Sequence, residues 1–422
     1  MNEEFLSFIW KYRLYKADNL NLEGEQIEII YPGELNIDSG PDFFNAKIKI
    51  GDTLWVGNAE VHSKASDWNR HNHDQNAAYD NVILHITEQN DMPVFTSKGR
   101  QVPAIEMIFE KKYLHIYNEL MLKQKWIPCA DSINSVDSII LSSWLSKMGI
   151  ERLETRTNHI LDNLTHTTND WDEAFYRQLA RNFGFHVNSQ PFDSLAMATP
   201  YKIIKKHSHN LIQLEALLFG QAGLLFDDHN QDEYYVKLKE EYEFLRSKYY
   251  LHPIDTHIWK FMRLRPGNFP TIRIAQFAQI LHHNSTLCSI ILDTENLNSL
   301  LQLFAVDVSE YWQAHYTFGN VSHPVRKLLG LESAKAIIIN TVVPLYFLYG
   351  KKMGLPQYQD KALLFLEQIE AETNSTITQW KNLNIIPKNA FDSQALLQLR
   401  NEYCDKKRCL KCGIGAKIIV SI

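Results

Sequence analysis

Residues 40–64 read GPDFFNAKIKIGDTLWVGNAEVHSK. In residues 46–50 apolar side chains occupy every second position, which is typical of a β-strand with one buried face. The dipeptide Gly51-Asp52 then favours a tight turn, and residues 54–61 continue as a second strand. This stretch therefore predicts a β-hairpin, and the rest of the N-terminal fold can be built around it.

Three further segments surround the hairpin. Residues 5–14 carry apolar side chains at helical spacing, so they predict a short amphipathic helix. Residues 26–31 predict a strand, and residues 81–87 (NVILHIT) are almost wholly apolar, as expected for a strand buried on both faces. We therefore expect a mixed α/β domain over residues 1–128.

The remainder of the chain is dominated by helical periodicity. This helical pattern shows no repeat of fixed length, so it favours a compact helical domain over residues 129–400 rather than a solenoid. A cysteine-rich C-terminal tail follows over residues 401–422. The predicted fold class is therefore α+β. The clearest expected helices cover residues 172–183, 211–225, 231–249, 272–282, 297–311 and 361–373.

Composition limits the protein class. The 422 residues are 45% hydrophobic and 22% charged, which is ordinary for a packed globular protein and excludes disorder as the main state. The net charge of −6 arises within residues 1–125, where 13 basic residues face 19 acidic ones, so a globally basic nucleic-acid coat is excluded. The acidic N-terminus is unlike a signal peptide, and the apolar stretch 336–349 is shorter than a membrane span. We expect a cytoplasmic protein without a membrane partner.

Two carboxylates on the hairpin carry the most specific chemical prediction. Side chains alternate along a strand, so Glu60, His62 and Lys64 share one face. Asp42 lies just before the first strand and can face Glu60 if the strand register permits. Mg²⁺ or Mn²⁺ needs one or two such oxygen ligands, with His62 or Lys64 as the basic group for phosphodiester hydrolysis. The alternative for both acids is structural, a turn residue and a solvated strand edge.

The hairpin resembles the PD-(D/E)XK nuclease superfamily, with Pro41-Asp42 and Glu60-Val61-His62 as the two halves of its motif. The resemblance implies a restriction-endonuclease-like αβββαβ core and cleavage of nucleic acid. His62 occupies the position that is Lys in the superfamily pattern. Either His62 or Lys64 could therefore be the catalytic base. The resemblance also implies a third metal ligand.

An acid from the first helix would supply that ligand. Glu4 fits this position, with Asp38 or Glu34 as competitors.

The sequence also resembles, over a longer stretch, a bacterial family known only as a domain of unknown function. The stretches that carry this second resemblance are Gly-Pro-Asp-Phe-Phe-Asn-Ala from residue 40, Ala-Glu-Val-His from residue 59, and Arg-Pro-Gly-Asn-Phe-Pro from residue 265. It extends over most of the chain and implies no activity.

Histidines after the hairpin offer a rival site. His71 and His73 lie in a polar, turn-like segment, and His85 lies in the next predicted strand. Together with His62 and Asp74 they could gather round one ion, as in a zinc or manganese hydrolase. The alternative is that each is a hydrogen-bonded structural residue, which we favour for His85 because its strand is apolar.

Cysteines near the C-terminus form a separate candidate site. Cys404, Cys409 and Cys412 lie within nine positions among cationic residues, and Cys129 is the best fourth ligand for zinc or an iron–sulfur cluster. This ligand set resembles that of cluster-containing PD-(D/E)XK nucleases, although there the distant cysteine precedes the nuclease motif. The alternative is an unmetallated tail. Cys288 lies in an apolar helix and is expected in the core.

Arg263, Arg265 and Arg273 flank a proline-rich loop in the helical region and could contact phosphates, although helix capping is the commoner role for such residues. The sequence therefore predicts a metal-dependent nuclease or phosphodiesterase acting on nucleic acid. The alternative is a non-catalytic binding or scaffold protein with a structural zinc or iron–sulfur site.

Overall fold

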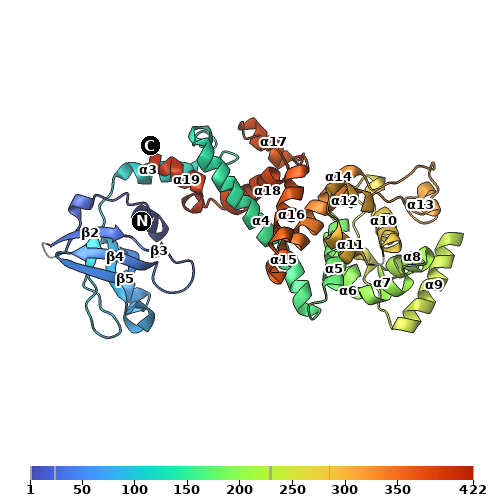
Figure 1. Ribbon diagram of the computed structural model, residues 1–422, viewed down its shortest axis with the longest axis horizontal. Helices are drawn as coiled ribbons and strands as arrows, with labels where there is room; N and C mark the ends of the chain where they lie inside the picture. Colours follow the sequence, from blue (N-terminus) through green and yellow to red (C-terminus); the bar gives the residue numbers. More distant parts are fainter. Residues whose placement is uncertain (1, 23–24, 228–230, 285, 422) are drawn as a thin grey trace. The chain divides into compact units, whose positions relative to one another are not determined.

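The protein consists of two compact units, each described by itself. The computed structural model describes residues 2–22, 25–227, 231–284 and 286–421. The first unit combines Met1–Trp144 with Leu399–Ile422, and the second is Leu145–Gln398. The first contains a mixed sheet and the second is helical (Figure 1), so the predicted α+β class is confirmed.

This division differs from the three parts expected from the sequence. The boundary follows Trp144 rather than residue 128, because residues 129–144 stay with the sheet. The C-terminal segment is not a separate tail either, since it belongs to the first unit and folds into η8 (Leu399–Cys404), η9 (Cys409–Lys411) and α19 (Gly413–Ser421).

Seven strands form the sheet of the first unit. They are β1 (Asn21–Leu22), β2 (Glu25–Tyr31), β3 (Glu34–Leu35), β4 (Phe43–Ile50), β5 (Thr53–Lys64), β6 (Val82–Gln89) and β7 (Ala104–Glu106). The order is β1-β2-β4-β5-β6-β7, with β3 also paired to β4. Pairing is antiparallel from β1 to β5 and parallel from β5 to β7, so β5 lies between the two kinds of ladder.

The predicted hairpin is formed by β4 and β5. Phe43 pairs with Ala59 and Ile50 with Thr53, with a bulge after Phe43 where Asn45 adopts a left-handed conformation. Bulges fix register because the extra residue fits at one place only. Gly57 lies so close to the segment before β6 that a Cβ atom there would be 2.7 Å from the carbonyl oxygen of Asn81.

Short helices complete the first unit. They are α1 (Glu3–Lys11), α2 (Asp67–Arg70) and α3 (Lys111–Leu122), with the 3₁₀ turns η1 (Ala17–Asn19), η2 (His73–Gln75), η3 (Ala77–Tyr79) and η4 (Ile133–Ser135). Helix α1 packs on β5 through an apolar face that includes Phe5, Ile9 and Trp10, all fully buried. The Trp10 indole N–H also donates to the carbonyl of Pro32, at 2.9 Å, and this bond ties the helix to the sheet.

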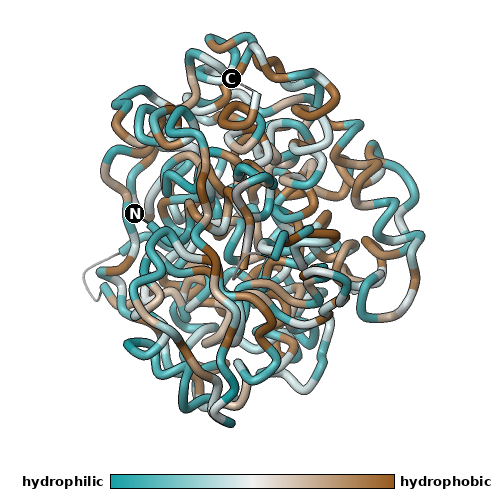
Figure 2. The backbone as a smooth tube through the Cα atoms, turned by 90° about the vertical axis from the view of Figure 1, so that its left-hand side faces the viewer, coloured by the Kyte–Doolittle hydropathy of each residue, from teal (hydrophilic) through white to brown (hydrophobic). Residues whose placement is uncertain are grey.

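Helices build the second unit almost entirely. They are α4 (Ser138–His166, which begins in the first unit), α5 (Trp171–Phe183), α6 (Ser189–Ala198), α7 (Tyr201–His207), α8 (Leu211–Gln221), α9 (Glu233–Tyr249), α10 (Pro270–His283), α11 (Leu287–Asp293), α12 (Leu297–Leu303), α13 (Glu310–Ala314), α14 (Leu331–Ile337), α15 (Val343–Met353), α16 (Pro356–Gln368), α17 (Ser375–Asn382) and α18 (Ala390–Gln398). Three short turns complete it: η5 (Thr256–Ile258), η6 (Pro266–Asn268) and the π-helical η7 (Ile338–Val342). Hydrophobic stretches alternate with hydrophilic ones along the backbone (Figure 2).

The helix expected over residues 297–311 is shorter than predicted, because α12 ends at Leu303 and α13 begins only at Glu310.

One helical stretch, Leu331–Met353, is 23 residues long and, with a mean hydropathy of 1.4, apolar enough to cross a membrane. It is longer than the apolar run recognised in the sequence. Most of its apolar window is buried inside the unit, and the Asn340 carbonyl within it accepts hydrogen bonds from Gln178 and Asn182. These contacts are those of a core helix.

Candidate metal centre

Two carboxylates meet where β4 begins, as the hairpin pattern predicts. The Asp42 backbone N–H donates to Glu60 Oε2 at 2.9 Å, and the Val61 backbone N–H donates to Asp42 Oδ2 at 3.1 Å. Both bonds follow from the pairing of Phe43 with Ala59, which places Asp42 opposite Glu60. Each carboxylate keeps its second oxygen for another partner.

Four imidazoles gather beside these acids. Parallel pairing of β5 with β6 brings His85 to His62, whose Nδ1 lies 2.9 Å from His85 Nε2. The short helix α2 then turns the chain back, so that His71 Nδ1 lies 3.2 Å from His62 Nε2. His73 Nε2 lies 3.2 Å from Glu60 Oε1, and the rings of His73 and Tyr79 stack with centroids 3.7 Å apart.

Three of these imidazoles have the spacing of metal ligands. One nitrogen each from His62, His71 and His73 all lie within 4.8 Å of one another. Glu60 Oε1 approaches two of them, at 3.6 Å from His62 Nε2 and 3.2 Å from His73 Nε2. Glu60 is therefore the carboxylate best placed to share an ion with the imidazoles, and Asp42 adjoins it through the backbone.

Burial disfavours the ionised forms of both acids. Desolvation, with repulsion from Glu60 and Glu3, raises the pKa of Asp42 to about 7. Desolvation also raises the pKa of Glu60 to about 8, although the N–H of Asp42 opposes the rise. A divalent cation would remove both causes, because it replaces the missing solvation and neutralises the repulsion.

The buried imidazoles are held neutral. Desolvation and neighbouring rings lower the pKa of His62 to about 2, and burial lowers that of His85 to about 3. Burial also lowers the pKa of His73. Neutral imidazole is the form that binds metals, because protonation occupies the donor nitrogen.

An open pocket of about 750 Å³ lies next to this cluster. Its polar wall includes Glu3, Lys64 and Arg70. Glu3 also connects it to the acids, because its charge raises the pKa of both Asp42 and Glu60. Asp67 also lines this pocket and pairs with Arg70 at 3.0 Å, so the wall carries two acids and two cations.

Comparison with known proteins places the chain in one family. The model of DUF2851, a protein of unknown function, matches residues 3–375. The chain belongs to the DUF2851 family. No curated protein and no solved structure matches it. The expected membership is thus confirmed, and the residues that form the candidate metal centre lie inside the DUF2851 match, whereas the three C-terminal cysteines lie beyond it.

The structure places other expected ligands outside the centre. Glu4 faces Lys411, with 3.4 Å between their charged atoms, so the acid of the first helix that reaches the site is Glu3. Asp38 and Glu34 are exposed, and Glu34 lies in β3. Sequence reasoning missed Glu3 because both acids lie in the first turn of α1 and only packing selects between them.

Lys64 is not at the carboxylates. Its side chain is exposed at the pocket wall, and its charge lowers the pKa of Asp91 at the surface. Its backbone N–H bonds to Asp67 Oδ2 at 3.0 Å, which helps to begin α2.

The arginines of the helical unit divide into two kinds. Arg263 and Arg265 are exposed. Arg273 is buried, stacks on Phe185 and donates to Gln276 and Asn268, at 2.9 and 2.7 Å. Its expected role in phosphate contact is therefore corrected, because packing keeps this guanidinium from a large polyanion.

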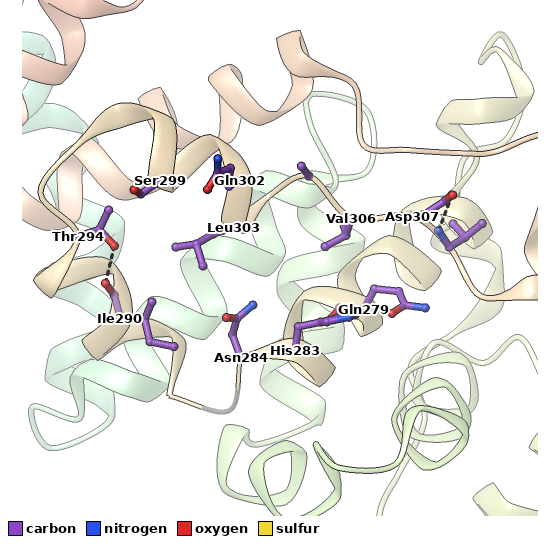
Figure 3. Close-up of a pocket in the computed structure, with 12 residues that line it drawn as sticks. Gln279, His283, Asn284, Ile290, Thr294, Ser299, Gln302, Leu303, Val306 and Asp307 are labelled. Carbon is purple, nitrogen blue, oxygen red and sulfur yellow. Dashed lines mark hydrogen bonds between the residues drawn. The ribbon is translucent and has the colours of Figure 1, made fainter.

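A second open pocket, of about 670 Å³, lies in the helical unit (Figure 3). Its titratable groups are engaged in local bonds: His283 Nδ1 lies 2.7 Å from the carbonyl of Gln279, and Asp307 Oδ2 accepts from Arg326 at 2.9 Å. The other lining residues are mostly amides, hydroxyls and aliphatic side chains. The pocket thus lacks the acid–imidazole arrangement of the first unit.

Proposed function

We propose that this DUF2851 protein is a metal-dependent nuclease or phosphodiesterase. One observation carries the proposal: the half-buried Asp42 and the buried Glu60 lie beside three imidazole nitrogens that are within 4.8 Å of one another. Such a group of oxygen and nitrogen donors holds a divalent ion, and an open pocket beside it admits substrate.

The donors indicate which ion binds. Mg²⁺ prefers oxygen ligands, whereas imidazole suits zinc and other transition metals. Glu60, His62 and His73 are the central ligands, with Asp42 and His71 beside them. We therefore expect Mn²⁺ or Zn²⁺ to bind more tightly than Mg²⁺.

The chemistry follows from a bound ion beside two cations. An ion held by Glu60, His62 and His73 would supply acidification of a water molecule and polarisation of a phosphoryl oxygen. Lys64 and Arg70 at the pocket wall hold the phosphate by charge, and the exposed ring of His71 is placed to accept a proton. Phosphodiesters are the substrates that fit these cations.

The order of elements supports the resemblance to PD-(D/E)XK nucleases as far as the hairpin. Helix α1, strands β2, β4 and β5, and the later strand β6 follow the expected order. The link between β5 and β6 departs from it, because residues 65–81 contain the four-residue α2 and two 3₁₀ turns in place of a long helix. That link supplies His71 and His73, which favours an imidazole-rich variant of the site.

The test is cleavage of labelled single- and double-stranded DNA and RNA by the full chain with Mn²⁺, Zn²⁺ or Mg²⁺. The double variant Asp42→Asn/Glu60→Gln keeps side-chain shape but removes both charges, and Glu34→Gln in β3 is the matched control at an exposed acid. We expect cleavage by the wild type and the control and none by the double variant.

Cleavage that survives in the double variant would refute the site. Absence of both cleavage and metal binding in the wild type would favour the scaffold alternative.

A further inference from the structure

A second cluster of side chains that can bind metal lies in the first unit, and none of its residues belongs to the candidate metal centre. Cys129, Cys404, Cys409 and Cys412 are all buried and carry free thiols. Cys129 follows α3, and the other three lie in the C-terminal segment that contains η8 and η9. Buried thiols contributed by segments that are far apart in the sequence need a physical reason to be together.

Two side-chain contacts hold these segments against each other. The Lys407 ammonium donates to the carbonyl of Met121, and the Arg400 guanidinium stacks 4.8 Å from the ring centroid of Trp126. Helix α19 also packs against α3. The segment around Cys404 and Cys409 is therefore fixed beside the segment that leads to Cys129.

The thiols lie within electrostatic reach of one another. Burial and then the charges of the other three raise the pKa of Cys404 above its ordinary value. Burial, Cys412 and Cys409 raise that of Cys129 to about 12. Together with the contacts between the two segments, this places the four buried thiols in one region of the first unit.

The site also offers hydrogen bonds to sulfur. The backbone N–H groups of Gly415 and Ile414 lower the pKa of the Cys412 thiol, against the effect of burial. Gly415 packs so closely that a Cβ atom there would lie 2.4 Å from the Cys409 carbonyl oxygen. N–H donors aimed at a cysteine sulfur are a regular feature of metal–thiolate centres, because they stabilise its negative charge.

The width of the cluster discriminates between metals. Zinc–sulfur bonds of about 2.3 Å in a tetrahedron place sulfurs about 3.8 Å apart. Among the residues that the structure describes, only the histidine group has three ligand atoms within 4.8 Å, so no three cysteine sulfurs are that close. Iron–sulfur clusters hold their thiolates on several iron atoms and so require a wider arrangement.

The spacing agrees with this conclusion. Cys404-(x4)-Cys409-(x2)-Cys412 matches the first three ligands of a known cluster spacing, C-x4-C-x2-C followed by a fourth cysteine, although here the distant Cys129 precedes the other three. We propose that Cys129, Cys404, Cys409 and Cys412 hold an iron–sulfur cluster through four thiolates, which fastens the C-terminal segment to the sheet-containing unit. Each thiol releases one proton as its sulfur binds iron, and assembly supplies iron and inorganic sulfide.

The first experiment is metal analysis of the full chain purified without oxygen. We expect iron and acid-labile sulfide in similar amounts, visible absorption from thiolate-to-iron charge transfer, and a paramagnetic signal after reduction. Cys404→Ala should lose nearly all iron and sulfide, whereas Cys288→Ala, at a buried cysteine of the helical unit, should keep them. Zinc without sulfide, or no metal at all, would overturn the proposal.

A second measurement covers the case in which Cys404→Ala fails to fold. The wild-type chain is stripped of iron with a chelator and then reconstituted with iron and sulfide, and limited proteolysis follows the C-terminal segment. We expect residues 399–421 to become cleavable in the stripped protein and protected again after reconstitution. Equal protection in both states would contradict the fastening role. Neither measurement depends on nuclease activity, so each can fail separately from the proposed function.

Discussion

Glu60 and Glu215 are both buried glutamates with raised pKa values, but their surroundings differ. Glu215 in α8 accepts hydrogen bonds through Oε2 from the Tyr234 hydroxyl at 2.5 Å and from the Trp312 indole at 3.0 Å. Its neighbours are neutral donors from the same helical unit. Glu60 instead adjoins a second carboxylate and two imidazoles. A buried acid therefore indicates a metal centre only when its neighbours are also potential ligands.

The strongest test of this comparison exchanges each acid for its amide. Glu60→Gln should weaken Mn²⁺ binding by at least about 100-fold, because it removes the negative charge of the carboxylate that lies beside His62 and His73. Glu215→Gln should leave Mn²⁺ binding unchanged. Titration calorimetry on the two full-length variants measures both. Equal affinities for the two variants would remove the distinction drawn between these acids.

The pH dependence of stability tests the environment of Glu215. Burial raises the pKa of this carboxyl from 4.5 to about 7 in the folded state, so the folded protein holds the proton more tightly. The resulting stability is fully present below 4.5 and is lost as pH rises through 7, up to about 3 kcal/mol. Denaturant unfolding across this range should show the loss.

Glu215→Gln should flatten this pH dependence, since the amide does not titrate. The variant and the wild type must be compared in the same unfolding transition, that of the helical unit. A wild-type transition that does not change between these pH values would show that Glu215 is ionised when folded.

Two histidines extend the comparison from acids to bases. His207 is bonded on both sides of its ring, with Nδ1 2.7 Å from Gln213 Oε1 and Nε2 2.9 Å from the Tyr249 hydroxyl. His73 faces Glu60 and lies near two other imidazoles. His73→Gln should weaken Mn²⁺ binding at least about tenfold, and His207→Gln should not. Electron paramagnetic resonance of free Mn²⁺ measures both, and a similar loss in each variant would indicate an effect through folding.

The smallest effect is expected at the pocket wall. Lys64→Ala should raise KM for a phosphodiester substrate a few-fold without a large change in kcat, because an exposed cation contributes binding but not chemistry. Lys98→Ala, at an exposed lysine that pairs with Asp80, is the control. A large fall in kcat for Lys64→Ala would instead assign this ammonium to the reaction itself.

Local patterns predicted much of the sheet and one pair at the site. Alternation in residues 46–50 and the apolar run in residues 81–87 predicted β4, β5 and β6, because side-chain period follows directly from backbone geometry. The placement of Asp42 beside Glu60 followed from the same hairpin. Selection between Glu3 and Glu4 did not, since neighbouring residues in a first helical turn diverge only once the helix is packed.

The sequence by itself determined the hairpin, the mixture of sheet and helices, and the residue types that can bind metal. Tertiary structure alone decided that His71 and His73 return to His62 and that residues 399–421 join the sheet-containing unit. The physical reason is the range of the interactions. Periodicity reports burial within one segment, whereas a ligand cluster depends on contacts between segments that are distant in sequence.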